Sequence, residues 1–162
     1  MTSKLTKNAA QPPTGIKKFL FRLPIKFYRA GLGWLMPKRF LFLTHIGRKS
    51  GQPRYAVVEV ADYDAANDIY YIVSGYGLKA QWYQNLMKTP DVDIQVGRRK
   101  MQVSAESLTP TASGEKMVQY ARRYPKLARQ LMSLLGYETD ESEASYRAIG
   151  EQGVRFVALH VQ

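Results

Sequence analysis

Apolar positions along the chain fall into two patterns, and each predicts one kind of element. Short apolar runs and alternating segments bounded by turn residues are typical of strands, whereas apolar residues at three- and four-residue spacing are typical of helices. Strands are expected near 40–46, 54–61, 69–73, 92–96, 101–105 and 154–160, with a turn at 62–68 and a hairpin at Gly97-Arg98. Helices are expected at about 15–36, 81–87, 111–135 and 140–150, with Tyr124-Pro125 interrupting the third.

This order of elements predicts a mainly β protein with helices, of the α+β class. Six strands with a mid-chain helix and hairpins are typical of a small antiparallel barrel with helices at its ends. We divide the chain into a disordered polar tail at 1–14, a basic amphipathic helical region at 15–36 and a barrel domain at 37–162.

The helical region at 15–36 has two interpretations. Either it packs on the domain with its cations in solvent, or it lies on an anionic membrane surface, where each cation adds about 1 kcal/mol. Scattered charges exclude a transmembrane span or a signal peptide, and Pro24 is expected to bend the helix or begin a second one. The apolar face carries Ile16, Phe19, Leu20, Leu23 and Phe27, and Lys18, Arg22, Lys26 and Arg29 lie opposite.

Charge is distributed unevenly along the sequence. The net charge is +11, yet all 13 Asp and Glu residues follow residue 54, whereas half of the 24 Lys and Arg residues precede residue 55. A nucleic-acid-binding face would be spread along the fold, so nucleic acid is disfavoured as a partner. The asymmetry favours a local anionic partner, either a membrane surface or a ligand.

The chain has no cysteine and two histidines, His45 and His160. This composition excludes thiolate catalysis, and no metal site is expected. An enzyme with these residues needs a bound cofactor for its chemistry. His45 falls on a predicted buried strand, where we interpret it as a hydrogen-bonded core residue.

The first candidate site is the loop that follows the strand at 40–46. Glycines allow backbone N–H groups to turn toward an anion, and Arg and Lys supply charge, so the loop suits a phosphate or carboxylate. A solvated hairpin tip has the same composition, and the spacing differs from that of a Walker-type phosphate loop. The candidate residues are Gly47, Arg48, Lys49, Ser50, Gly51, Pro53 and Arg54.

The second candidate site is Ser74-Gly75-Tyr76-Gly77, which leaves a predicted strand ahead of Trp82 and Tyr83. Glycines here would let a flat ligand approach the backbone, and the two aromatic side chains would wall an aromatic cofactor. A glycine-rich turn followed by core aromatics is the alternative interpretation.

Taken in order, these motifs resemble the deazaflavin-dependent nitroreductase family over roughly residues 38 to 160. The resemblance implies a split β-barrel of the FMN-binding type, coenzyme F420 as cofactor, and hydride transfer between the reduced deazaflavin and a small acceptor. The motifs that carry it are Leu43-Thr44-His45-Ile46-Gly47-Arg48-Lys49-Ser50-Gly51, Val73-Ser74-Gly75, Trp82-Tyr83-x-Asn85-Leu86 and Pro90-Asp91-Val92.

The resemblance also implies a role for each candidate residue. The cofactor's phosphate and acidic tail would be held by the loop amides, next to Pro53, and by the side chains of Arg48, Lys49 and Arg54. The ring would be lined by Ser74, Gly75 and Tyr76, and the pocket closed by Trp82 and Tyr83. The catalytic candidates are Tyr124, as a proton donor, and Tyr76; a tyrosine ending a helical turn is the alternative for Tyr124.

Departures from the family pattern concern the acceptor. The segment between Ser74 and Trp82 is shorter than in nitroimidazole-reducing members, and Leu127 and Gln130 replace tyrosines that follow Tyr124-Pro125 in those proteins. Leu127 favours an apolar acceptor, such as a quinone or lipid, over a nitroaromatic compound.

The resulting expectation is a cytoplasmic deazaflavin-dependent oxidoreductase, attached to the inner membrane face through 15–36. A homodimer is expected from the resemblance alone. An FMN-dependent enzyme of the same fold is an alternative, because both cofactors present a tricyclic ring and a phosphate. A non-catalytic binder of a flavin-like, haem-like or lipid ligand is another, since fold does not fix function.

Overall fold

The computed structural model describes residues 39–162, so the expected tail at 1–14 and helical region at 15–36 lie outside the described residues. The described residues form two compact units. The barrel unit contains 39–73, Gln81–Glu106 and Val157–Gln162, and the helical unit contains Ser74–Ala80 and Ser107–Phe156. Within 39–162, no helix is both long and apolar enough to cross a membrane.

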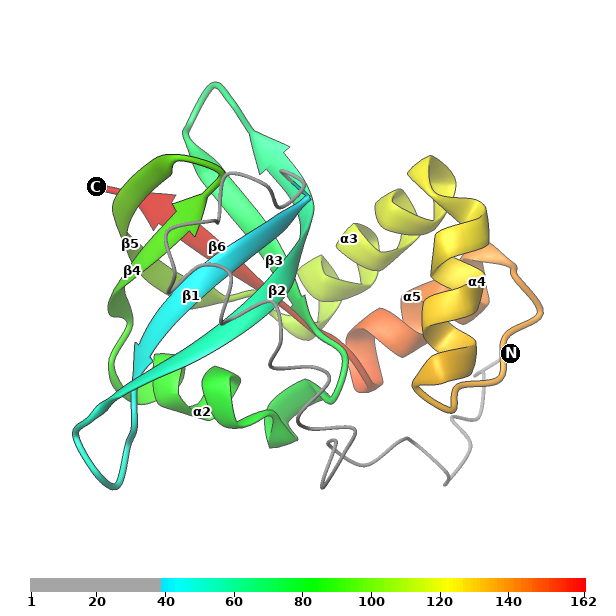
Figure 1. Cartoon of the computed structure of the whole chain (residues 1–162). Coiled ribbons are helices and arrows are strands. Elements are labelled where there is room, and N and C mark those ends of the chain that lie inside the picture. The colour runs from blue at the N-terminus through cyan, green and yellow to red at the C-terminus, as the bar shows by residue number, and fades with distance from the viewer. Residues whose placement is uncertain (1–38) are drawn as a thin grey trace. The chain divides into compact units, whose positions relative to one another are not determined.

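Six strands close into a barrel in the order β1-β2-β3-β6-β5-β4 (Figure 1). The β1–β2, β1–β4, β2–β3 and β4–β5 pairs are antiparallel. This confirms the predicted fold class and the number of strands. The strands are β1 (Phe40–Ile46), β2 (Pro53–Asp64), β3 (Ile69–Ser74), β4 (Asp91–Val96), β5 (Arg99–Ser107) and β6 (Arg155–Val161).

Alternate positions on the strands build the core of the barrel. On β1, Leu41, Leu43 and His45 are buried, whereas Phe42 and Thr44 are half-buried on the opposite face. Successive side chains of a strand point to opposite faces of the sheet, so one set of alternate residues fills the interior. β4 follows the same rule with buried Val92, Ile94 and Val96.

β2 extends further than the sequence predicts. It continues to Asp64, although its polar residues from 62 onward predict a turn. Tyr63 pairs with Tyr70 in the β2–β3 register, and their rings stack with centroids 4.4 Å apart. The chain turns only after Asp64, whose carboxylate accepts hydrogen bonds from the backbone N–H groups of Ala66 (3.1 Å) and Asn67 (3.3 Å). Side-chain stacking thus keeps this polar segment in the strand.

The predicted mid-chain helix is α2 (Gln81–Lys88), which packs against β1. Tyr83, Asn85 and Leu86 are buried on one face, whereas Gln81 and Lys88 are exposed. Burial of Tyr83 and Leu86 anchors the helix, and Gln81, Asn85 and Lys88 contact the loop that joins β1 to β2.

The helical unit contains three α-helices and a short 3-10 helix. The proline of Tyr124-Pro125 separates the first two, as predicted, because proline lacks the N–H that a continuous helix would use. Thr109 begins the first helix by accepting a hydrogen bond from the N–H of Ala112 (3.2 Å). The helices are α3 (Pro110–Arg123), α4 (Pro125–Leu134), α5 (Glu143–Gln152) and the 3-10 helix η2 (Gly77–Lys79).

Small residues allow α3 and α5 to pack closely. A Cβ atom at Gly150 would lie 2.6 Å from the carbonyl oxygen of Ser113 and 2.7 Å from the Cα of Gly114. Any larger side chain at Gly150 would push the two helices apart. Ser113 itself is fully buried, and its hydroxyl accepts from the N–H of Phe156 at 3.3 Å.

Candidate functional site

The loop between β1 and β2 is a tight turn closed by its own hydrogen bonds. The N–H of Gly47 donates to the carbonyl of Gln52 (2.8 Å), and the N–H of Gly51 donates to the carbonyl of Gly47 (2.8 Å). The N–H of Gln52 donates to Oγ of Ser50 (3.2 Å). Gly51 has φ of 69°, which favours glycine, and a Cβ at Gly47 would lie 2.5 Å from Ser50 Oγ. The backbone of the turn therefore favours glycine at position 51, whereas a Cβ at Gly47 would require the Ser50 side chain to move.

One face of α2 forms several hydrogen bonds with Arg48. The carboxamide oxygen of Asn85 accepts from the backbone N–H and from Nη1 of Arg48, both at 3.1 Å. Oε1 of Gln81 also accepts from Nη1 (2.9 Å), and Nζ of Lys88 donates to the Arg48 carbonyl (2.7 Å). Residues 81, 85 and 88 share a face because of the helical repeat. The structure thus brings α2 and the predicted anion loop together.

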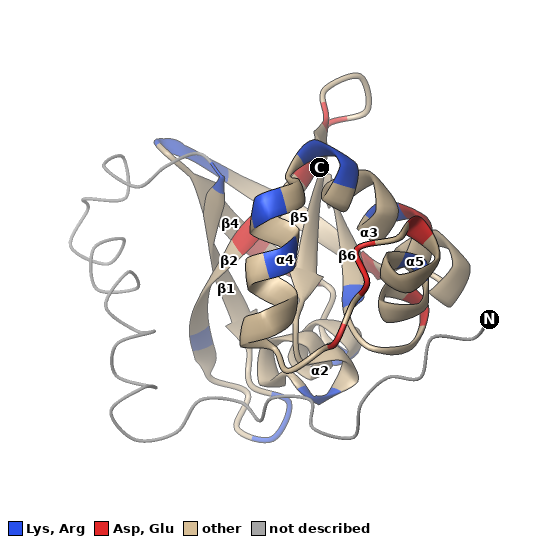
Figure 2. Ribbon diagram, turned by 90° about the vertical axis from the view of Figure 1, so that its right-hand side faces the viewer, with Lys and Arg blue, Asp and Glu red and all other residues tan. Residues whose placement is uncertain are grey.

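The charge of this loop is not neutralised by a carboxylate. Among the ion pairs between described residues, none involves Arg48, Lys49 or Arg54. The partners of the Arg48 guanidinium are neutral amides, and Lys49 and Arg54 are exposed. In Figure 2, Lys and Arg are blue and Asp and Glu are red, and both colours occur on the described strands and helices. The loop can therefore attract an anion without displacing an internal acidic partner.

The backbone amides of the loop are less available than the sequence predicts. Those of Gly47, Arg48 and Gly51 already donate inside the protein. Within the described part of the chain, the backbone N–H groups of Lys49 and Ser50 have no hydrogen-bond acceptor. Pro53 has no N–H and begins β2 opposite Ile46. Side-chain cations are therefore the main donors that the loop offers.

Trp82 and Tyr83 follow Gln81, the residue of α2 whose side chain accepts a hydrogen bond from Arg48. Their rings meet edge to face, with centroids 6.4 Å apart and an interplanar angle of 73°. Tyr83 is only 7% exposed and belongs mainly to the core, whereas Trp82 is half-buried. Trp82 is thus the more accessible ring for a ligand.

The glycine-rich segment of the helical unit is held by its own turn. The buried hydroxyl of Ser74 donates to the carbonyl of Gly77 at 2.7 Å. Gly77 has φ of 60° and its Cα faces the carbonyl oxygen of Gly153, so a side chain there would clash. Tyr76 is half-buried, and burial raises the pKa of its phenol. Tyr76 is protonated at neutral pH, and the raised pKa makes its phenol a weaker acid than an exposed tyrosine.

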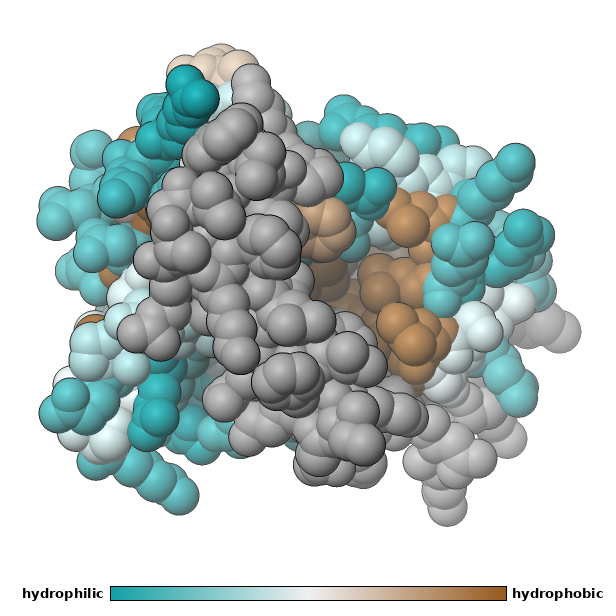
Figure 3. Space-filling model, viewed as in Figure 1, coloured by the Kyte–Doolittle hydropathy of each residue, from teal (hydrophilic) through white to brown (hydrophobic). Residues whose placement is uncertain are grey.

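Tyr124 joins α3 to α4 and is 41% exposed, with its ring 5.6 Å from that of Tyr120. The following helix presents an apolar stripe, because residues at spacings of four and three share a face. In Figure 3, brown apolar atoms gather beside α4. The stripe consists of Leu127, Leu131 and Leu134, of which the first two are half-buried and Leu134 is 67% exposed.

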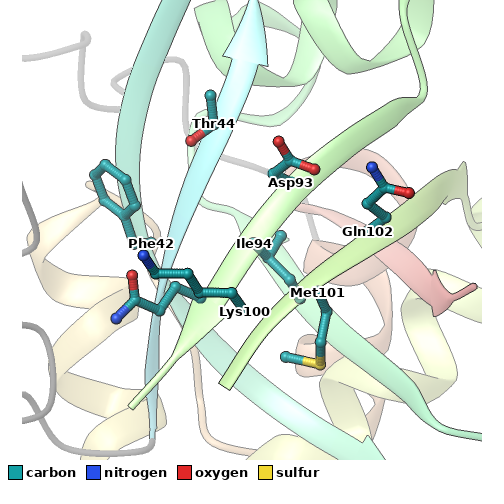
Figure 4. A pocket seen from close by; sticks show the side chains of 8 residues that line it. Phe42, Thr44, Asp93, Ile94, Lys100, Met101 and Gln102 are labelled. Carbon is teal, nitrogen blue, oxygen red and sulfur yellow. The ribbon is translucent and has the colours of Figure 1, made fainter. Parts of the chain in front are cut away.

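A concave surface that the sequence did not predict lies across β1, β4 and β5 of the barrel unit (Figure 4). Its volume is about 450 Å³. The charged side chains among its lining are Asp93 and Lys100, and none of the predicted site residues belongs to it. The lining consists of Phe42, Thr44, Asp93, Ile94, Gln95, Lys100, Met101 and Gln102.

Comparison with known proteins shows the family to which the chain belongs. Residues 20–132 match the F420H2-dependent quinone reductase family, which is more than half of the chain. The chain belongs to this family. The match includes the loop, the glycine-rich segment, α2 and Leu127, and it confirms the resemblance on which the sequence-based assignment rested.

Family relatives from Mycobacterium tuberculosis match shorter segments. The chain is 35% identical over 80 residues to Rv3178, which is 48% of this chain and 65% of that protein. It is 36% identical over 73 residues to the F420H2-dependent quinone reductase Rv1261c, which is 43% of this chain and 47% of that protein. The chain thus spans less than two thirds of either relative.

Solved structures confirm the fold of the family. The chain superposes on an F420H2-dependent reductase, FDR-A, with a TM-score of 0.52 and 18% identity, over 77% of this chain and 96% of that chain. A second similar structure, Rv2991 from Mycobacterium tuberculosis, has a TM-score of 0.52 and 18% identity, over 99% and 86% of the two chains.

Sequence reasoning missed the contact between the family's Asn85 and His45. The two side chains lie 2.9 Å apart, with exposed fractions of 4% and 5%. Burial, with a smaller effect from the charge of Arg54, lowers the pKa of His45 to about 4. The interpretation of His45 as a hydrogen-bonded core residue is therefore confirmed. Asn85 stood in the Trp82-Tyr83-x-Asn85-Leu86 motif, and this was the available signal.

Proposed function

We propose that this protein is a deazaflavin-dependent oxidoreductase that transfers a hydride between reduced coenzyme F420 and a small apolar, quinone-like acceptor. Family membership supports the cofactor and the reaction class. Because the chain spans only part of its curated relatives, the proposal also depends on what its own residues can bind.

The uncompensated charge at Arg48 carries this proposal. Its guanidinium is held by neutral amides of α2, next to exposed Lys49 and Arg54. These three side chains, with the N–H groups of Lys49 and Ser50, would bind the phosphate and carboxylates of the cofactor. Such anions prefer charge-assisted hydrogen bonds, which are roughly twice as strong as neutral ones.

The remaining candidate residues would act at the cofactor ring and the acceptor. Reduction of a quinone by two electrons consumes one hydride, which the reduced deazaflavin supplies when bound, and one proton. Tyr76 and Tyr124 are our candidates for the proton, and Leu127 with its stripe on α4 for apolar contact with the acceptor. We assign Ser74, Gly75 and Tyr76 to the ring, with Trp82 and Tyr83 at its edge.

The decisive experiment is a fluorescence titration of the full chain with oxidised F420 and, separately, with FMN. Binding of F420 alone, followed by turnover with a soluble naphthoquinone, is the expected result. Binding of FMN alone would replace the proposal with the FMN-dependent alternative. Binding of neither would leave a non-catalytic binder of another ligand as the better account.

Two double variants test the loop assignment. Arg48→Ala with Lys49→Ala should weaken F420 binding by about tenfold or more, because each lost charged hydrogen bond contributes 1.5–3 kcal/mol. Arg98→Ala with Lys100→Ala removes the same charge around the β4–β5 hairpin and serves as the control. Equal losses in both variants would show that only net charge matters and would contradict the assignment.

We further propose that residues 15–36 attach the protein to an anionic membrane, where an apolar quinone would be found. All eight charged residues before Arg39 are Lys or Arg, which supports attraction to anionic lipids. A variant without residues 1–36 should lose sedimentation with anionic vesicles, and salt should weaken binding by the full chain. Persistent binding of the truncated chain would contradict this proposal. The homodimer also stays a prediction, and sedimentation equilibrium would test it.

A further inference from the structure

Asn85 connects the buried interior of the barrel unit to the cationic loop. Its carboxamide lies between Nδ1 of His45 (2.9 Å) and two donors of Arg48, the backbone N–H and Nη1 (both 3.1 Å). His45 lies on β1, Arg48 in the loop after β1, and Asn85 on α2. One side chain thus joins three segments of the barrel unit.

The donors of Arg48 determine the orientation of this carboxamide. A backbone N–H and a guanidinium can only donate, so the atom of Asn85 that faces them is the oxygen. The NH2 group must then face His45 and donate to Nδ1. Nδ1 therefore accepts, and the proton of the neutral ring is on Nε2. Arg48 therefore donates to the oxygen of Asn85, and the NH2 group of Asn85 donates to His45.

We propose that Asn85 is a positioning residue that holds Arg48 in place for the anionic part of the cofactor, and that Nδ1 of His45, as an acceptor, supports the orientation that the donors of Arg48 give to Asn85. This inference rests on the proposed function, because it presumes that Arg48 binds the cofactor. Neither Asn85 nor His45 is itself assigned a contact with the cofactor.

The opposite orientation of the carboxamide is unfavourable at both ends. A proton on Nδ1 would face the NH2 group, and rotating the carboxamide would place NH2 against the two donors of Arg48. Both arrangements leave buried polar groups without acceptors, which costs about 1–3 kcal/mol per group. The positively charged Arg54, paired with His45 across β1 and β2, further disfavours a proton on the ring.

Nitrogen NMR of the wild-type protein tests the orientation without any substitution. The chain has two histidines, and His160 is 42% exposed and pairs with Glu106, so the signals can be separated. Near neutral pH we expect His45 to carry its proton on Nε2 with Nδ1 unprotonated. A proton on Nδ1 would overturn the inference. Asn85→Asp should raise the pKa of His45 from its value of about 4, since a carboxylate favours the charged ring.

A double-mutant cycle tests whether Asn85 acts through Arg48. Asn85→Leu should weaken F420 binding about tenfold. At metal sites, loss of a residue that orients a ligand-binding side chain lowers affinity by about 10–100-fold, and we expect the lower end of this range. If Asn85 acts through Arg48, adding Asn85→Leu to Arg48→Ala should weaken binding no further. Met87→Ala, at a 41% exposed position of the same helix, should leave affinity unchanged.

The outcomes separate this inference from the proposed function. If Arg48→Ala leaves F420 affinity unchanged, the loop assignment fails. If Arg48→Ala weakens binding but Asn85→Leu does not, or if the two losses add, the positioning role of Asn85 fails while the loop assignment survives. Non-additive losses together with the Nε2 proton would support both.

Discussion

Leu135 fills the space beside Gly75, so that a Cβ at Gly75 would lie 2.9 Å from both Cδ atoms of Leu135. The glycine that the sequence assigns to close approach of a flat ligand thus has a packing role as well. Overpacking of this kind costs about 1–3 kcal/mol. We expect Gly75→Ala to lower the free energy of unfolding by that amount in chemical denaturation.

The partner substitution separates packing from other effects. Leu135→Ala alone removes a buried leucine and should cost about 2–5 kcal/mol. Gly75→Ala combined with Leu135→Ala should cost less than the sum of the single changes, because the clash disappears. If the stability losses of the two single variants add in the double variant, the contact with Leu135 is not the reason for glycine at position 75.

Gly51 and Gly97 allow a matched comparison of two hairpins. Both have positive φ, 69° and 58°, and a Cβ at either position would meet no atom within 4 Å. Alanine at either position should destabilise the fold by about 1–2 kcal/mol through the backbone alone. Only Gly51→Ala should also weaken F420 binding in fluorescence titrations, because its methyl group would occupy space beside the cationic loop. Weaker binding in both variants would point to a general effect of lower stability.

His45 should make stability depend on pH in the mildly acidic range. Its pKa is about 4 in the folded protein and 6.5 ordinarily, so the unfolded chain binds the proton first as pH falls. This contribution is complete above the ordinary pKa and is lost progressively as pH falls toward the folded-state value. Between about pH 7 and about pH 5, we expect a loss of about 2 kcal/mol from this residue.

Urea denaturation at both pH values measures this loss. Carboxylates also titrate toward the lower value, so the comparison is with His45→Gln, in which only the histidine contribution is removed. The variant should lose about 2 kcal/mol less than the wild type over the same interval. The same pH dependence in both proteins would contradict the assigned burial of a neutral histidine.

The leucine stripe of α4 should determine affinity for an apolar acceptor. Leu127→Gln should raise KM for a naphthoquinone by about tenfold, the usual effect of losing a hydrophobic contact of one or two methylenes. The Kd for F420 should stay unchanged, since the cationic loop is intact. Lys126→Gln, at an exposed position of the same helix, is the control in steady-state assays. A matching change in Kd would assign Leu127 to the cofactor instead.

Much of the fold could be predicted because each strand carries its own pattern. The signals in Leu41 and Leu43 on β1 depend only on neighbouring residues, as does the helix break at Tyr124-Pro125. The structure places all of them as expected. Tyr63 was missed because its stacking partner, Tyr70, belongs to the next strand. The role of Leu135 beside Gly75, and of Asn85 beside Arg48, depends on contacts between residues distant in sequence. No periodicity or composition encodes such pairs.

The 37-residue separation between Arg48 and Asn85 has a consequence for the order in which the protein folds. A β1–β2 hairpin can form early, because its strands are neighbours along the chain, but contacts between distant segments form only after a larger loop has closed. The turn is closed by its own hydrogen bonds, but Arg48 acquires its contacts with Gln81 and Asn85 only when α2 docks against the barrel. The anion binding that we propose would therefore require the assembled unit, and an isolated peptide of residues 40–60 would carry the charges without the contacts that hold Arg48.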